Sequence, residues 1–236
     1  MSILRLMSYN IHSGIDRRGH RDLRRICDLM DNLDIDIGVF QEVETRPSYG
    51  GSKADIDILA GKNRPYHLPG PSLKESKGWY GNLIVSKYPI KRALVHNLET
   101  FRALQPRNAV DALIDTPHKM VRIIGTHLSL SSLVRWHEIN NLIALASKVD
   151  DETPGPLFLL GDINEWRWPS KLLKHLNTIF TPLPAEKSFP SFCPVFRLDR
   201  AWYDHGNIKA HAQILKGPET KYLSDHLPLL IEVHKL

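Results

Sequence analysis

Short apolar stretches recur along the whole chain, and most of them have the length and alternation of β-strands. The segments between them contain many glycine, proline, asparagine and aspartate residues, which favour turns. The clearest strand signals fall at 4–8, 36–42, 82–86, 109–114, 121–127, 157–160, 198–203, 208–215 and 229–233. The pattern predicts a protein built mainly from short strands.

Two longer segments instead carry apolar residues at helical spacing. The first spans 23–33 and follows Asp22, a candidate helix cap. The second spans 132–149 and is followed by a Pro-Gly-Pro stop at 154–156. One face of this second helix is expected to be buried, namely Trp136, Ile139, Leu142, Ile143, Ala146 and Val149. A shorter helix is predicted near 170–176.

The connections suggest one domain with a long loop. Residues 44–78 are rich in Gly, Pro, Ser and Lys, and only 66–68 looks like a strand, so a mobile binding loop is predicted there. No repeat or interdomain linker interrupts the chain, and residues 1–236 are expected to form a single domain. Many strands with few helices favour two β-sheets packed on each other and covered outside by helices.

The composition is that of an ordinary globular protein. Hydrophobic residues make up 42% and charged residues 24% of the chain, so a core is expected without disulfides. Cys27 and Cys193 lie far apart and are expected to be buried thiols. No apolar run approaches the roughly 18 residues of a membrane-spanning helix. Because the N-terminal stretch also lacks the form of a signal peptide, a cytoplasmic protein is expected.

The charge favours anionic partners. The net charge is +5 and the pI is near 9.2, which suits nucleic acid, peripheral contact with a phospholipid surface, or phosphorylated small molecules. The local cluster of basic residues is Arg17, Arg18, Arg21, Arg24 and Arg25. These arginines form either a track beside a binding site or the solvated face of a helix.

Polar side chains follow five of the predicted strand ends. They are Asn10, Glu42, His127, Asp162 with Asn164, and Asp225 with His226. Rigid strands hold such groups accurately while their tips stay open to a substrate, so the residues are candidates for one catalytic site. Each also has a simpler structural interpretation as a turn residue, a solvated carboxylate or a hydrogen-bonded core histidine.

The chemistry of these residue types suits phosphate ester hydrolysis. Asp162 and Asn164, two apart along an extended backbone, are expected to point the same way, as a carboxylate that orients water and an amide that fixes a phosphate. Asp225 beside His226 would pair a cation-binding carboxylate with a group that contacts a phosphoryl oxygen. Glu42 is a suitable ligand for Mg²⁺, which takes one or two carboxylates and keeps several waters.

The order of the motifs resembles the endonuclease/exonuclease/phosphatase superfamily nearly from end to end. The matching motifs are SYNIH at 8–12, FQEV at 40–43, YGNLIVS at 80–86, GTHL at 125–128, GDIN at 161–164, RLDR at 197–200 and SDHLP at 224–228. The stretch 188–200 resembles a bacterial subgroup whose members are simply called hydrolases. The resemblance implies an α/β (α+β), DNase I-like fold, a four-layered sandwich of two mostly antiparallel sheets flanked by helices.

The resemblance also implies a role for each motif residue. Glu42, with Asn10 close by and Asp225 beside it, matches the binding site for Mg²⁺ or Mn²⁺. Asp162 matches the residue that positions the attacking water, and Asn164 its companion. His226 matches the histidine on the scissile phosphate, Asp199 the carboxylate that orients it, and His127 a second histidine of the DNase I and sphingomyelinase branches. Arg107 and Asn82 resemble phosphate-side residues.

Several functions stay open at this point. The favoured one is a metal-dependent phosphodiesterase that acts on nucleic acid, phospholipid or a small phosphoester, expected as a monomer. One alternative is a phosphomonoesterase such as an inositol-phosphate phosphatase. Another is a non-catalytic binding module on the same fold, and the fold alone does not decide among them.

Overall fold

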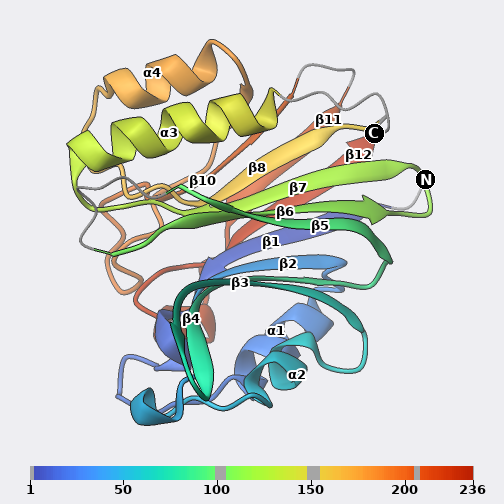
Figure 1. Cartoon of the computed structure of the whole chain (residues 1–236), viewed down its shortest axis with the longest axis vertical. Helices are drawn as coiled ribbons and strands as arrows, with labels where there is room; N and C mark the ends of the chain where they lie inside the picture. Colours follow the sequence, from blue (N-terminus) through green and yellow to red (C-terminus); the bar gives the residue numbers. More distant parts are fainter. Residues whose placement is uncertain (1–2, 99–104, 148–154, 205–207, 236) are drawn as a thin grey trace.

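The computed structural model describes residues 3–98, 105–147, 155–204 and 208–235, and its centre is a pair of six-stranded β-sheets packed face to face (Figure 1). The first sheet runs in the order β11-β12-β1-β2-β4-β3 and the second in the order β5-β6-β7-β8-β10-β9. The strands of the first sheet are β1 (Leu4–Asn10), β2 (Ile37–Glu44), β3 (Tyr66–Glu75), β4 (Gly78–Ser86), β11 (Lys209–Ile214) and β12 (Leu229–Lys235). Those of the second are β5 (Ile90–Asn97), β6 (Asn108–Asp115), β7 (Met120–His127), β8 (Leu157–Asp162), β9 (Thr181–Leu183) and β10 (Asp199–Tyr203).

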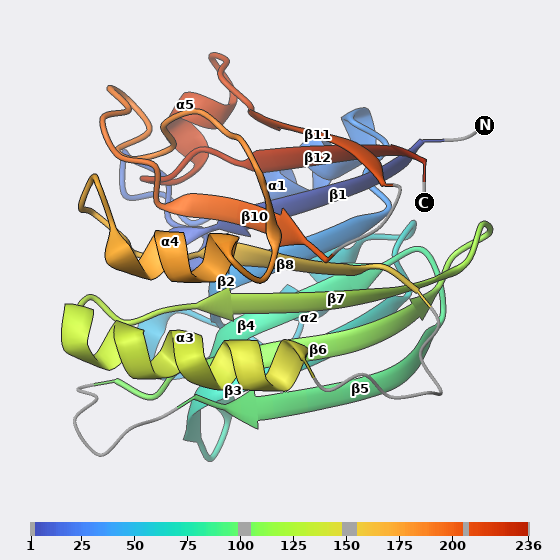
Figure 2. The same ribbon diagram turned by 90° about the horizontal axis from the view of Figure 1, so that it is seen from above.

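Helices cover the two outer faces. The helices are α1 (Arg24–Asn32), α2 (Asp55–Ala60), α3 (Ser132–Ala146), α4 (Lys171–Asn177) and α5 (Thr220–Leu223), with 3-10 turns at His12–Gly14 and Pro47–Tyr49. Figures 1 and 2 show α1 and α2 on the side of the first sheet and α3 and α4 on the side of the second. The predicted sandwich of two sheets flanked by helices is therefore confirmed.

Three apolar clusters fill the spaces between these four layers. In β8, Phe158 and Leu160 face the cluster between the sheets, whereas Leu157 and Leu159 face α3 and α4. Successive side chains of a strand point to opposite faces, so a strand buried on both faces needs a continuous apolar run. This is why the central strands gave the strongest sequence signal.

Each sheet contains one parallel pair, and these pairs determine where the polar strand ends meet. β1 pairs with β2 and β7 pairs with β8 in parallel, while the other eight pairings are antiparallel. The carboxyl ends of parallel neighbours lie at the same edge of a sheet. Asn10 is accordingly in register with Gln41, and His127 with Asp162.

The structure corrects the prediction of a long loop at 44–78. This segment contains α2 and the ten-residue strand β3, which pairs with β4. The strand β5 was not predicted at all. The prediction that both cysteines are buried is also half wrong, because Cys27 is buried and Cys193 is exposed.

The buried face of α3 is partly the predicted one, because Ile139, Leu142 and Ala146 are buried and Ile143 is partly buried. Trp136 is 40% exposed and stacks on His175, with 5.5 Å between the ring centroids. Arg135 and Glu138 are buried in its place. Val149, the last residue of the predicted face, lies outside the described residues. None of the helices in the described ranges combines the length and the apolar character needed to cross a membrane.

Candidate active site

Three adjacent strands of the second sheet bring polar residues to one level. In the strand pairing, Asp162 at the end of β8 is the partner of His127 at the end of β7 and of Asp199 at the start of β10. Asn10 ends β1 in the facing sheet, and its side chain reaches across to Asp162. The two sheets therefore contribute to the same cluster of side chains.

Asp162 is the centre of this cluster. Its Oδ2 accepts a hydrogen bond from Asn10 Nδ2 at 3.0 Å and lies 3.6 Å from Nε2 of both His127 and His226. The residue is 1% exposed. Burial raises the pKa of Asp162 to about 6, although the positive charge of His226 opposes this rise. Asp162 is thus a carboxylate poised to lose or accept a proton near neutral pH.

His226 forms a tight pair with Asp199. The two side chains are 2.8 Å apart between Nδ1 and Oδ2, and both are buried. Burial by itself lowers the pKa of His226, but the carboxylates of Asp199 and Asp162 outweigh it and raise the pKa to about 10. Its ring is therefore an imidazolium at neutral pH. The hydroxyl of Ser224 donates to Asn10 O at 2.8 Å and accepts from the His226 backbone N–H, which ties this loop to β1.

Glu42 reaches the site because β2 contains a bulge. The register of β2 on β4 shifts between Phe40 and Val43, and Glu42 adopts a left-handed φ of 59°. Such bulges redirect side chains and occur often beside active sites. Glu42 Oε1 accepts from Asn10 Nδ2 at 3.0 Å, so one amide nitrogen joins Glu42 to Asp162.

Asp225 and Glu42 meet at His12. Nδ1 of His12 lies 3.8 Å from Glu42 Oε2 and 3.6 Å from Asp225 Oδ1. The carboxylates are partly open to solvent, with side-chain exposures of 22% for Glu42 and 41% for Asp225. His12 was predicted as part of a motif but was given no role.

The carboxylates of Glu42 and Asp225 fit a hard divalent cation. No group of three or more His, Cys, Asp or Glu side chains within the described ranges is arranged to hold a metal ion. Mg²⁺ needs fewer protein ligands, because one or two carboxylates and several waters commonly complete its shell. Asn10 presents Nδ2 to Glu42 and Asp162, and its Oδ1 accepts from the His12 backbone N–H. In this orientation Asn10 joins Glu42 to Asp162, and its Oδ1 keeps one lone pair that the His12 N–H does not use.

Asn164 joins the site through a turn. β8 ends at Asp162, and Asn164 has a left-handed φ of 53°, so the expected extended arrangement of the two residues is wrong. The backbone N–H of Asn164 donates to Asp162 Oδ1 at 3.0 Å, and its Nδ2 lies 3.0 Å from His127 Nε2. Nδ2 of Asn164 also donates to Leu128 O. Asp162 and Asn164 therefore form a turn, and both side chains still contribute to the same cluster.

The Nδ1 side of His127 faces a cation, whereas an acidic group would be needed there to favour a charged ring. Its Nδ1 lies 3.4 Å from Arg107 Nη1. Burial, and then the charges of Arg107 and His226, lower the pKa of His127 well below its ordinary value. The guanidinium at Nδ1 and the Asn164 amide nitrogen at Nε2 both only donate, so a neutral ring accepts from one of the two. His127 is therefore a neutral hydrogen-bonding group beside Asp162.

Asn82 lies behind the site and is held structurally. Its Nδ2 donates to the backbone and side-chain oxygens of Asn108, at 3.1 and 2.8 Å. Asn108 in turn donates to Gly70 O. Arg107 and Asn82 were both predicted to lie near the phosphate. Arg107 contacts the cluster through His127, whereas the side-chain nitrogen of Asn82 is bonded to Asn108 on β6.

Tyr80 was missed as a member of the site. Its hydroxyl interacts with Glu42 and Arg107, and burial together with the Glu42 charge raises the pKa of Tyr80 above its ordinary value. The residue lies on β4 opposite the bulge that carries Glu42. Its position inside the YGNLIVS motif was the available signal, but the spacing alone did not distinguish Tyr80 from its neighbours.

Two of the five arginines in the local basic cluster form ion pairs with carboxylates. Arg21 pairs with buried Asp55 at 2.7 Å, and Arg25 lies 3.5 Å from Asp16. Arg17 and Arg18 remain exposed. The predicted five-residue basic track is therefore reduced by two paired members.

Known proteins resemble this chain both in sequence family and in fold. The model of the Endonuclease/Exonuclease/phosphatase family matches residues 7–226. An endonuclease/exonuclease/phosphatase from Beutenbergia cavernae is 18% identical, with a TM-score of 0.78, covering 99% of this chain and 72% of that one. A second, from Bacteroides vulgatus, is 17% identical, with a TM-score of 0.78 and full coverage of both chains. A mannosyl-6-phosphatase from Bacteroides thetaiotaomicron is 15% identical, with a TM-score of 0.77, covering 98% and 100%. No curated protein matches the sequence.

Proposed function

The chain belongs to the endonuclease/exonuclease/phosphatase family, and from this premise we propose that it is a Mg²⁺- or Mn²⁺-dependent phosphodiesterase. The observation that carries the proposal is the convergence of Asn10, Glu42, Asp162 and the His226–Asp199 pair at one edge of the sandwich. Such a set supplies a base, a cationic hydrogen-bond donor and a carboxylate for a metal. These are the groups that hydrolysis of a phosphate ester requires.

Asp162 is assigned to the attacking water. Its Oδ1 is used by the Asn164 backbone N–H, which leaves Oδ2 to orient a water for in-line attack and to accept its proton. A pKa of about 6 suits this task, because the group is mostly ionised at neutral pH and still basic enough to take a proton. Asn10 donates to the same oxygen, and neutral His127 lies 3.6 Å from it.

His226 is assigned to the phosphoryl oxygens. Negative charge develops on these oxygens during attack, and a fixed imidazolium stabilises that charge more in the transition state than in the ground state. Asp199 keeps the ring charged and fixes its orientation. Arg107 is placed behind His127 and adds positive potential to the same side of the site.

Glu42 and Asp225 are the residues that would hold the cation, with Asn10, Tyr80 and His12 orienting them. When bound, a divalent cation supplies charge neutralisation for the phosphate and the leaving oxygen. The carboxyl oxygens are hard ligands, which suit Mg²⁺ or Mn²⁺ better than a soft metal.

The test is hydrolysis of bis(p-nitrophenyl) phosphate with added Mg²⁺ or Mn²⁺. Asp162→Asn and His226→Gln are each expected to lower kcat/KM by about 10²–10³, the effect of losing one preorganised group. His67→Gln, at an exposed histidine on β3, is the matched control and should behave like wild type. Equal rates in all variants would refute the site, and a faster reaction on p-nitrophenyl phosphate would identify a monoesterase instead.

A further inference from the structure

Two neighbouring loops beside the site expose an unusual number of large apolar side chains. The loop after β8 exposes Trp166 (37%) and Trp168 (77%), and the loop before β10 exposes Phe192 (52%), Val195 (47%) and Phe196 (37%). We call these five residues the apolar rim. Exposed apolar groups are ordinary when scattered, but a contiguous set marks a contact surface.

The apolar rim adjoins the catalytic histidine. Phe189 packs on His226 with 4.8 Å between the ring centroids, and Trp166 contacts the rings of Phe189 and Phe196 at 5.5 and 4.8 Å. Figure 2 shows the loops after β8 and before β10 at the same end of the molecule. A surface that docks on the rim is therefore held next to the phosphate-binding edge.

The loop that carries most of the rim is tied down by backbone hydrogen bonds. The N–H groups of Val195 and Phe196 both donate to Phe189 O at 2.8 Å, and Ser191 N donates to Asp225 O at 2.7 Å. The backbone of this loop is thus satisfied locally, and its apolar side chains project from a fixed base. Projecting apolar groups on a rigid base are suited to insertion into an apolar medium.

Cationic groups surround the rim. The guanidinium of Arg17 lies 4.5 Å from the centroid of the Phe192 ring, and that of Arg18 lies 5.2 Å from the Tyr222 ring. Arg167 and Arg197, within the two loops, are exposed as well. Aromatic side chains combined with arginine are the composition of protein segments that lie in the interface of an anionic membrane.

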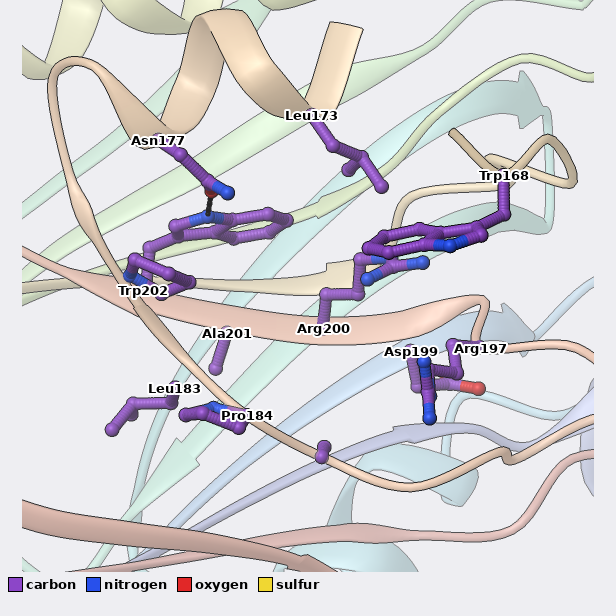
Figure 3. Close-up of a pocket in the computed structure, with 12 residues that line it drawn as sticks. Trp168, Leu173, Asn177, Leu183, Pro184, Arg197, Asp199, Arg200, Ala201 and Trp202 are labelled. Atoms are coloured by element: carbon purple, nitrogen blue, oxygen red, sulfur yellow. Dashed lines mark hydrogen bonds between the residues drawn. The ribbon is translucent and has the colours of Figure 1, made fainter. Parts of the chain in front are cut away.

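A pocket of about 300 Å³ opens behind the rim, and Figure 3 shows its lining between α4 and β10. Trp168 belongs to both the rim and the pocket, Arg197 follows the rim residue Phe196 in the chain and also lines the pocket, and Leu173, Leu183 and Trp202 form its apolar wall. Burial, and then the charge of Arg197, lower the pKa of Arg200 to about 10. Neither arginine forms an ion pair with a carboxylate in the described part of the chain. The pocket thus combines an apolar wall with two arginines against the single carboxylate of Asp199, and this net positive charge suits part of an anionic amphiphile.

We propose that the apolar rim docks on an anionic phospholipid surface and that the ester cleaved at the adjoining site is the phosphodiester of a lipid headgroup. The docking stands on the rim, the arginines and the pocket. The substrate class rests in addition on the proposed function. A nucleic acid would use the arginines and some of the rings, but it gives no role to Val195 or to an apolar pocket behind the site.

Docking is tested by sedimentation with vesicles in EDTA, so that no hydrolysis is involved. Wild type should bind vesicles of equal parts phosphatidylcholine and phosphatidylglycerol, bind pure phosphatidylcholine more weakly, and lose affinity as salt rises. The double variant Phe192→Ser/Val195→Ser should bind at least about tenfold more weakly. The matched control is Leu94→Ser/Val95→Ser, two similarly exposed positions on the edge strand β5. It should bind like wild type.

Several results would overturn the docking: no sedimentation of wild type, equal binding by the Phe192→Ser/Val195→Ser variant, or an equal loss in the control. Binding of a single-stranded oligonucleotide that depends on the same residues, without vesicle binding, would assign the rim to nucleic acid instead. If the double variant fails to fold, wild type is mixed with vesicles whose lipids are brominated in their acyl chains. Insertion of Trp168 would quench the tryptophan emission, and emission that stays unquenched would overturn the docking.

The substrate class has its own readout. With Mg²⁺, wild type should release the headgroup from the phosphatidylglycerol vesicles. Hydrolysis of the soluble diester without hydrolysis of the lipid would overturn the substrate class and leave the proposed function standing. Vesicle binding in EDTA without hydrolysis of either ester would overturn the proposed function and leave the docking.

Discussion

Replacing Asp199 by asparagine tests the electrostatics of the site most directly. Asp199 lies at the start of β10, is fully buried, and accepts from His226 Nδ1 at 2.8 Å. Asparagine has nearly the same size and retains an oxygen, so the packing is preserved while the negative charge is removed. The substitution therefore separates the charge of Asp199 from its shape.

The expected size of the effect follows from the surroundings of His226. Burial lowers its pKa, and the two carboxylates raise it to about 10. Without Asp199, the charged ring is still favoured by Asp162, with Oδ2 at 3.6 Å from Nε2, and by the smaller effect of Asp225. The pKa of His226 should fall, and the neutral ring would no longer stabilise the developing charge. Loss of one such group costs about 2.7–4 kcal/mol of barrier, or about 10²–10³ in kcat/KM.

The pH profile distinguishes this explanation from a general loss of structure. In wild type, activity should rise as Asp162 ionises through a pKa of about 6 and fall as His226 loses its proton near 10. A base with a raised pKa needs the alkaline side of that value, whereas a cationic donor needs the acidic side of its own. In Asp199→Asn the alkaline limb should therefore move toward neutral pH, and the acidic limb should move toward lower pH, because the charge of Asp199 also raises the pKa of Asp162.

The assay is kcat/KM for bis(p-nitrophenyl) phosphate across pH at saturating Mg²⁺, together with thermal unfolding. Asp115→Asn, at a partly exposed carboxylate on β6, is the control for loss of a charge. A variant of Asp199 with kcat/KM within about threefold of wild type, or with an unmoved alkaline limb, would refute the assigned role of this carboxylate, because loss of a real donor should cost far more.

Two further predictions concern other parts of the molecule. Asp31→Asn leaves the fully buried guanidinium of Arg64 without its carboxylate. Because the side chain of Asp31 is 36% exposed and solvent weakens the pair, the unfolding free energy should fall by about 1–3 kcal/mol, measured by urea denaturation. Asp28→Asn, exposed on the same helix, should change it by under about 0.5 kcal/mol. Tyr80→Phe removes a hydroxyl that orients Glu42 and should raise the half-activating Mg²⁺ concentration by about tenfold, with little change in kcat at saturation. An unchanged Mg²⁺ requirement would remove Tyr80 from the metal side of the site.

The central strands were predictable from the sequence, whereas of the four edge strands only β11 was predicted over its full length. β1, β7 and β8 lie inside their sheets and show apolar runs because both faces are buried. β3 and β5 lie at the edges. An edge strand pairs on one side only and tolerates proline, so β3 contains Pro69, Gly70 and Pro71 and was taken for a loop. The hydrophobic pattern of a segment therefore depends on how deeply its strand is buried, as well as on whether it forms a strand.

Buried polar pairs caused the error on α3. Glu138 accepts from the hydroxyl of Ser129 at 2.6 Å, and Arg135 Nη2 lies 3.3 Å from Glu165 Oε2. Because each of these groups finds its partner in another segment, two charged side chains are buried on a face that is otherwise apolar. Hydrophobic periodicity assigns charged residues to the solvent side, so it shifted the predicted face toward Trp136 and away from Arg135 and Glu138.

The site residues at the ends of regular strands could be predicted, because parallel neighbours bring such ends together whatever their distance in sequence. Asn10, His127 and Asp162 are of this kind. Tyr80 depends instead on the bulge that turns Glu42 toward it. A bulge is created by the pairing between strands, so no spacing within either strand announces it.

A structural turn at Asp162 is compatible with the catalytic role proposed for its carboxylate, because the carboxylate has two oxygens. Oδ1 accepts from the Asn164 backbone N–H and closes the turn that ends β8. Oδ2 faces Asn10, His127 and His226 and is the atom available for chemistry. The turn fixes the carboxylate plane and so determines where Oδ2 points. A turn residue and a base are therefore not alternatives at this position, because the first role supplies the preorganisation that the second requires.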